Sequence, residues 1–336
     1  MMTFEDRVRA LEPLGFTPRQ TRFIATVALH SGYCLRRQYG AFAGVRYGKN
    51  VCDFLETLVE RRLADRFTQR PDRGLIYHLQ ARAIYRALGQ DENRNRRDAS
   101  AALIARKIMV LDYVLGHPEL DWLATEADKV ELFADRYDVP RADLPQQVFT
   151  ASQPDRPGTT RYFTHRLPVA VAGDPPVAYF VYLVTDTTGR GLAQFLEDHA
   201  RLFGWLPAWT VVAVSASPVA LESCDAVFGQ HLQQPRRAVT ATVEDLRWFF
   251  TTRQTIDRGE LSRLSVAAID RFRALRERFA AAPFDAVYAE WCQRGESALA
   301  AHAPVAGRSP KQSVGQLITD ALKFDYSQFG SLPGVA

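Results

Sequence analysis

With 336 residues, of which 47% are hydrophobic and 24% charged, the chain has the composition of a globular protein large enough for two cores. It shows no leader, no CxxC pair and no apolar run near the roughly 20 residues that span a bilayer, so we expect a cytoplasmic protein without membrane partner, metal site or disulfides. The net charge of +4 is uneven: residues 1–110 hold 20 Lys and Arg against 11 Asp and Glu, an excess that favours nucleic acid as a partner.

Four short helices are expected in the first sixty residues. Apolar residues recur there at helical spacing, and Thr17 followed by Pro18 is a favourable helix start. The pattern places the helices at residues 4–14, 18–29, 35–43 and 48–62. The last helix carries a continuous apolar stripe, so we expect one of its sides to be buried.

A basic hairpin follows these helices. Residues 63–67 and 75–79 have strand composition, and the turn-rich segment 68–74 lies between them. Helices followed by such a hairpin, in this order over residues 15–80, resemble the winged helix-turn-helix of bacterial regulators. The resemblance implies that residues 1–89 bind double-stranded DNA, with the helix at 48–62 as recognition helix and the hairpin as wing.

The candidate DNA contacts are polar and basic side chains at three places in this region. Arg and Lys pair with guanine or phosphate, and Asn pairs with adenine. The candidates are Arg46, Tyr47, Lys49 and Asn50 at the start of the recognition helix, Arg70 and Arg73 at the wing, and Arg36, Arg37 and Gln38 as a clamp on the backbone. The alternative is a winged domain that contacts proteins, with these charges merely solvated.

Residues 90–150 are predicted to form a helical connector. Helices are expected at 81–89, 98–116 and 125–137, with a turn at 118–122. The helix at 98–116 has an apolar stripe of Ile104, Ile108, Leu111 and Leu115. Such a stripe is either the seam of a homodimer or the core-facing side of a helix, and the pattern does not separate the two. Because winged regulators commonly dimerise on palindromic sites, we expect a homodimer.

Residues 151–336 are predicted to form a small α/β core followed by helices. Strands are expected at 161–165, 167–172, 177–184 and 209–214, with a helix at 189–205 before the last strand. His199, on the apolar face of that helix, is expected to be a core residue rather than a ligand. Further helices are expected at 243–250, 262–279, 284–291 and 314–322. The whole chain is therefore predicted to be a multidomain α+β protein.

A basic winged helix, a helical connector and a strand–strand–helix–strand core together resemble the replication-relaxation type of mobile-element protein. The second domain of that family is similar to the restriction-endonuclease-like fold, whose active members place an acid before the second strand and Glu-x-Lys on it. Here Asp174 stands at the first position, but the strand Tyr179–Val184 holds neither Glu nor Lys. The resemblance therefore implies a scaffold without catalytic residues, and we expect neither an enzyme nor a cofactor.

The main functional hypothesis is sequence-specific binding of double-stranded DNA by a dimeric transcriptional regulator. Its carboxy-terminal domain would then sense a small-molecule or protein effector. A replication or maintenance protein of a plasmid, phage or integrative element is the first alternative. A metal-dependent nuclease with a degenerate active site is the second.

Overall fold

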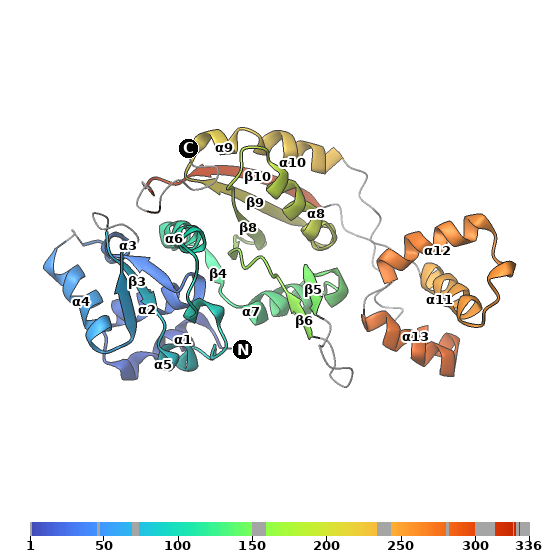
Figure 1. Ribbon diagram of the computed structural model, residues 1–336, viewed down its shortest axis with the longest axis horizontal. Coiled ribbons are helices and arrows are strands. Elements are labelled where there is room, and N and C mark those ends of the chain that lie inside the picture. Colours follow the sequence, from blue (N-terminus) through green and yellow to red (C-terminus); the bar gives the residue numbers. More distant parts are fainter. Residues whose placement is uncertain are drawn as a thin grey trace.

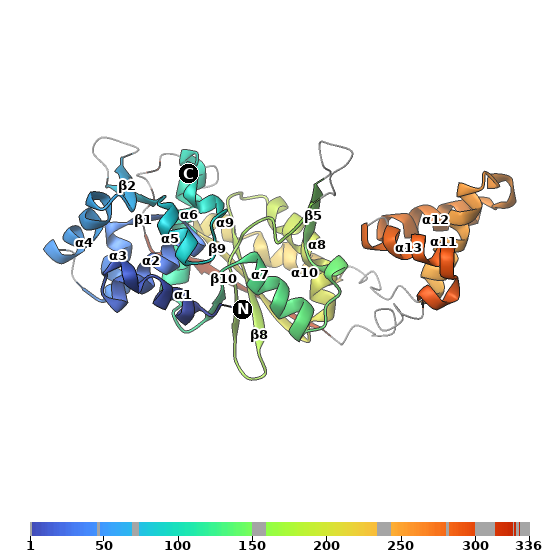
Figure 2. The ribbon, with the colours of Figure 1, turned by 90° about the horizontal axis from the view of Figure 1, so that it is seen from below.

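The computed structural model describes residues 2–45, 48–68, 74–149, 159–233, 243–279, 282–299, 313–324, 326 and 329. It is an α+β protein, and the described residues form a three-stranded, a five-stranded and a two-stranded sheet. Figures 1 and 2 both show the first hundred residues at one end, the five-stranded sheet in the middle and a group of three helices at the other end.

The amino-terminal end combines helices with a three-stranded antiparallel sheet. We call residues 4–79 the N-terminal module; its elements are α1 (Phe4–Ala10), α2 (Pro18–His30), β1 (Tyr33–Leu35), α3 (Arg36–Ala43), α4 (Lys49–Glu60), β2 (Ala64–Phe67) and β3 (Ile76–Leu79). The four predicted helices and both predicted strands are confirmed in this region, except that Leu35 belongs to β1 and not to the third helix, and Thr17 caps α2 as expected. The strand β1 was not predicted, and it pairs with β3 so that the strand order is β1-β3-β2.

One apolar core holds the N-terminal module together. The stripe predicted on α4 is buried at Val51, Phe54, Leu55 and Leu58, and these side chains pack with Phe23 of α2. Aromatic edge contacts connect three helices, since the ring of Phe23 lies 5.0 Å from Tyr39 and 6.2 Å from Phe54. Packing of this kind leaves only the opposite side of α4 exposed.

The short helix α5 (Arg82–Ala87) follows the N-terminal module, and the connector contains the longer helix α6 (Ala101–Gly116). Ile104, Ile108 and Leu111 on α6 are almost completely buried by the chain's own residues. Of the two alternatives for this stripe, the core-facing side is therefore confirmed. The helix α6 packs against β1 on one side and β8 (Val177–Leu183) on the other.

The five-stranded sheet contains a strand from the connector. Asp121 and Trp122 belong to β4 (Asp121–Leu123), so the predicted turn was wrong at these two residues. The strand pairs antiparallel with β7 (Val169–Ala172), although it is too short to show alternation in the sequence. The helix predicted after Thr125 is confirmed as α7 (Glu126–Val130), which continues as a π-helix over Glu131–Arg136.

The strands predicted at 167–172, 177–184 and 209–214 and the helix at 189–205 are confirmed, but the strand predicted at 161–165 was wrong at residues 163–165, which form a bend and a turn. β8 runs antiparallel to β7 and parallel to β9 (Ala208–Ser215), and α8 (Arg190–Trp205) connects the two parallel strands. Phe203 of α8 stacks on Trp209 of β9, with ring centroids 3.9 Å apart, and meets Phe180 of β8 edge to face. A hairpin of β5 (Gln146–Phe149) and β6 (Thr159–Tyr162) precedes this core.

The prediction of a helix at residues 314–322 was wrong. These residues form β10 (Val314–Ala321), which pairs in parallel with all eight residues of β9. Gly315 lies against the indole of Trp209, and Trp209 Nε1 donates a hydrogen bond to Ser313 Oγ at 2.8 Å. Pairing with residues about one hundred positions earlier in the chain makes this segment a strand, so its local sequence alone does not determine its structure.

The remaining helices are α9 (Pro218–Leu221), α10 (Cys224–Gln233), α11 (Val243–Asp257), α12 (Val266–Phe279) and α13 (Ala282–Arg294). The last three share a separate aromatic core that includes Phe249, Phe250 and Phe279. Within the described ranges, no helix is both long and apolar enough to cross a bilayer.

Candidate nucleic-acid interface

The amino-terminal end of α4 is exposed and polar. Lys49 and Asn50 both face solvent, and neither side chain makes a hydrogen bond or ion pair with the residues that the structure describes. The helix is preceded by Gly48, so no side chain caps its first turn. Uncapped amides and the helix dipole make this end favourable for a phosphate or a base edge.

Arg36, by contrast, is held by its neighbours. Its Nε donates to the Tyr77 hydroxyl at 2.8 Å, and its Nη2 donates to Glu56 Oε1 at 2.7 Å. Glu56 also pairs with Arg66 on β2. Burial raises the pKa of Glu56, but hydrogen bonds from Tyr77 and Arg36 outweigh it and hold that pKa below its usual range. Glu56 therefore compensates part of the positive charge of Arg36 and Arg66 within the N-terminal module.

Arg37 and Gln38 are engaged by Asp112 of α6. Arg37 binds both carboxylate oxygens, at 2.6 and 2.7 Å, and Gln38 Nε2 donates to Oδ1 at 2.9 Å. The hydroxyl of Tyr326 donates to the same carboxylate at 2.6 Å. Gln38 is only 1% exposed, and Arg37 lies over the ring of Phe324. Because these donors already have partners, we do not propose Arg37 and Gln38 as the phosphate clamp that was predicted from the sequence.

Four other predicted contacts, Arg46, Tyr47, Arg70 and Arg73, lie outside the described residues. They remain predictions from the sequence. The structure therefore places Lys49 and Asn50 on the surface and draws Arg36, Arg37 and Gln38 into internal contacts.

Arg19 is a candidate that the sequence pattern did not single out. Its Nη1 donates to the carbonyl of Ala43 at 2.9 Å, next to the turn that leads into α4. A carbonyl does not neutralise a guanidinium, so Arg19 keeps its charge beside the exposed end of that helix. Only the three-dimensional contact between the start of α2 and the end of α3 reveals this.

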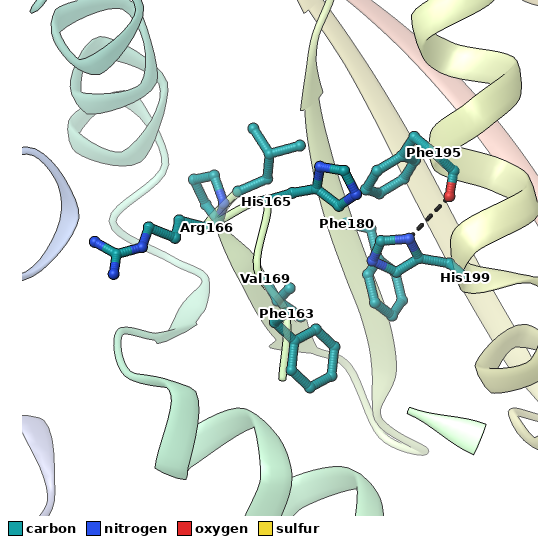
Figure 3. Close-up of a pocket in the computed structure, with 9 residues that line it drawn as sticks. Phe163, His165, Arg166, Val169, Phe180, Phe195 and His199 are labelled. Carbon is teal, nitrogen blue, oxygen red and sulfur yellow. Dashed lines mark hydrogen bonds between the residues drawn. The ribbon is translucent and has the colours of Figure 1, made fainter. Parts of the chain in front are cut away.

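The α/β core contains a small aromatic cavity of about 10 Å³, room for one water molecule. It is lined by Phe163, His165, Phe180, Phe195 and His199, among others (Figure 3). His199 Nδ1 lies 2.8 Å from the carbonyl of Phe195, and burial lowers the pKa of this imidazole to about 3. His199 is therefore a neutral core residue, as predicted. His165 pairs with Asp198 at 2.9 Å beside a hollow of about 290 Å³.

The residues around β8 do not form a carboxylate site. Asp174 precedes the strand, and Asp186 follows it, where it accepts hydrogen bonds from Thr188. Between them, the tyrosines at 179 and 182 are the only polar side chains of the strand. In the part of the chain that the structure describes, no three His, Cys, Asp or Glu side chains lie together as metal ligands would.

Comparisons with protein-family models, with curated proteins and with solved structures found no match to this chain.

Proposed function

We propose that the chain binds double-stranded DNA sequence-specifically, through a winged helix-turn-helix made of α2, α3, α4 and the sheet β1-β3-β2. The observation that carries this proposal is the exposed amino-terminal end of α4, where Lys49 and Asn50 make no pair with any residue that the structure describes, in a module with that order of elements. In such modules the helix after the turn enters the major groove by its first residues, and the hairpin contacts the backbone.

The chemistry of the exposed end suits this role. The Asn50 amide can donate to and accept from one adenine edge, and Lys49 can pair with guanine or a phosphate. Arg19 and the amides of the first α4 turn supply phosphate contacts on the same side. Asp53, one turn further along α4, is exposed and has the chemistry to accept from cytosine. Together these groups offer different contacts to different bases, which is the basis of specificity.

A transcriptional regulator, acting as a homodimer on a two-fold site, is our first proposal for the biological role. The dimer does not use the α6 stripe, because that stripe is buried within one chain. A replication or maintenance protein is the second proposal. The sheet order β4-β7-β8-β9, with α8 between two parallel strands, supports the resemblance to an endonuclease-like scaffold. The carboxylate positions around β8 give no reason to propose cleavage.

Affinity for duplex DNA is expected to fall steeply with salt. If Arg19, Lys49, Arg70 and Arg73 each contact one phosphate, the slope of log K against log salt is about −3.6 for each bound subunit, at about −0.9 per contact, and changes of slope are counted per subunit. Fluorescence anisotropy with a labelled duplex measures this slope. Lys49→Ala should make it less steep by about 1. Arg82→Ala, which removes an exposed arginine paired with Asp91, should leave it unchanged.

Two results would count against the electrostatic interface. One is an affinity that does not change between low and physiological salt. The other is an equal change of slope in Lys49→Ala and Arg82→Ala, because the cation at α4 would then have no special place in binding.

A further inference from the structure

Three arginines that make no ion pair with a described residue lie on two separate segments, and both segments pack against Tyr33 and the region of α6. Arg94 and Arg97 flank the short helical turn that follows α5, and Arg166 lies in the connection between β6 and β7. All three are exposed, and none makes an ion pair with a described residue. Neighbouring arginines behave differently: Arg82 pairs with Asp91, and Arg161 lies 3.9 Å from Glu126.

Buried contacts fix the segment of Arg94 and Arg97 in place. Lys107 of α6 donates to Asn95 Oδ1 at 2.8 Å and to the carbonyl of Ser31 at 2.9 Å. The Tyr33 hydroxyl donates to the carbonyl of Arg97 at 3.2 Å. The turn that carries both arginines is therefore attached to the N-terminal module and to α6 at once.

The segment of Arg166 is fixed against the same region. Leu167 packs into the apolar cluster that contains Tyr33 and Ile108, and its carbonyl accepts a hydrogen bond from Lys129 at 2.8 Å. Arg166 itself has a left-handed backbone, φ 54°, and its amide donates to the carbonyl of Phe163. Arg166 forms part of the wall of the aromatic cavity, but Figure 3 shows its guanidinium end pointing away from His165 and His199.

The surrounding charge is strongly positive. Partial desolvation by the segments packed around it lowers the pKa of Arg166, and the charges of Arg94, Arg161 and Arg97 lower it further, while Glu126 raises it. The pKa of Lys107 is lowered to about 8 by burial and by Arg166. Like charges in one region repel one another, and a bound anion would relieve that repulsion.

We propose that Arg94, Arg97 and Arg166 form a binding site for a phosphate group with more than one negative charge, or for adjacent phosphates. Guanidinium groups bind phosphate oxygens through paired hydrogen bonds, and these three are accessible to solvent. Lys107 already uses its ammonium for Asn95 and Ser31, so it contributes charge rather than a direct contact. The phosphates can come from a nucleotide or from a DNA backbone, and the experiment separates these sources.

The first measurement needs no DNA, so it is independent of the function proposed above. Isothermal titration of the full chain with inorganic pyrophosphate, at fixed ionic strength, should show saturable binding. Arg166→Gln and Arg97→Gln should each weaken that binding about tenfold, the effect of losing about 1.4 kcal/mol of charge-assisted contact. Arg82→Gln replaces an exposed arginine that is already paired with Asp91, and this variant should bind pyrophosphate as tightly as the parent does. Without pyrophosphate, Arg166→Gln should melt at a higher temperature than the parent because repulsion is relieved.

The second measurement is duplex affinity of the same variants. A loss in Arg166→Gln and Arg97→Gln but not in Arg82→Gln, without pyrophosphate binding, identifies the phosphates as those of DNA. Pyrophosphate binding without an effect on DNA affinity identifies a nucleotide-like ligand. The proposal is overturned if neither binding assay responds to the two variants, or if Arg82→Gln loses as much. If the chain binds no DNA at all, the function proposed above fails, but the pyrophosphate titration still tests the arginine site.

Discussion

Replacing Asp128 by alanine is expected to destabilise the folded chain by about 3–5 kcal/mol, the usual cost of leaving one partner of a buried ion pair alone. Arg7 of α1 binds both oxygens of Asp128 at 2.8 Å, and both side chains are only 6% exposed. Arg7 Nε has no hydrogen-bond partner among the described residues even in the intact protein, so losing the carboxylate would leave the whole guanidinium buried and uncompensated. Urea unfolding followed by circular dichroism measures the loss.

The control for this variant is Asp91→Ala, which breaks the exposed pairs with Arg82 and Arg86 and should cost about 0–1 kcal/mol. Equal, small losses in the two variants would show that the Arg7–Asp128 pair does not hold α1 against α7.

The same pair contributes a pH dependence. Burial raises the pKa of Asp128, but hydrogen bonds and the charge of Arg7 outweigh it, so the net pKa in the folded chain is lowered. The stabilisation that ionised Asp128 gives to the folded chain is therefore complete above the pKa of about 3.9 that an Asp has in the unfolded chain. It is lost as the pH falls through the lower pKa of Asp128 in the folded chain. Asp128→Asn should lack this acid-dependent loss.

Gly32→Ala is expected to cost about 2–5 kcal/mol. Gly32 has φ 80°, which strains any residue with a Cβ, and the added methyl would overlap the carbonyl of Asn95. That neighbour is backbone, so the turn after α2 and the turn that carries Arg94 and Arg97 would have to separate. The midpoint of urea unfolding measures the effect.

Gly44→Ala is the matched control, since Gly44 also has a left-handed φ of 64° but nothing within 4 Å of an added Cβ. Only the conformational cost of about 1 kcal/mol is expected there. If Gly44→Ala destabilises the chain as much as Gly32→Ala, the tight contact with Asn95 is not what requires glycine at position 32.

Elements with strong local signals could be predicted from the sequence. The helix α2 has a cap at Thr17 and a proline at its first position, and α4 and α8 have apolar stripes. Strands selected by distant partners could not be predicted. β1 and β4 have three residues each, too few to show alternation. The segment of β10 contains apolar residues at spacings that suit a helix as well as a strand, and only pairing with β9 decides between them.

The candidate site also has one part that could be predicted from the sequence and another that could not. The exposed end of α4 follows from the local pattern, because the apolar stripe determines which side is buried. Sequence does not distinguish a free arginine from a paired one. Arg37 meets Asp112 75 positions later, and Tyr326 approaches the same carboxylate from 214 positions beyond it. Conversely, the sequence does not show that the charge of Arg94 influences Arg166, because only folding brings these two segments into one region.

The most direct test of DNA reading by α4 is the affinity of Asn50→Ala for a duplex selected by the parent protein and for a scrambled duplex of the same composition. We expect a loss of about 1–3 kcal/mol on the selected duplex and little change on the scrambled one, because Asn50 is assigned to a base rather than to a phosphate. Gln90→Ala removes a side-chain amide outside α4 and should change neither affinity. An Asn50→Ala protein that binds the selected duplex as tightly as the parent, or loses affinity for both duplexes equally, would contradict the assignment of α4 as the recognition helix.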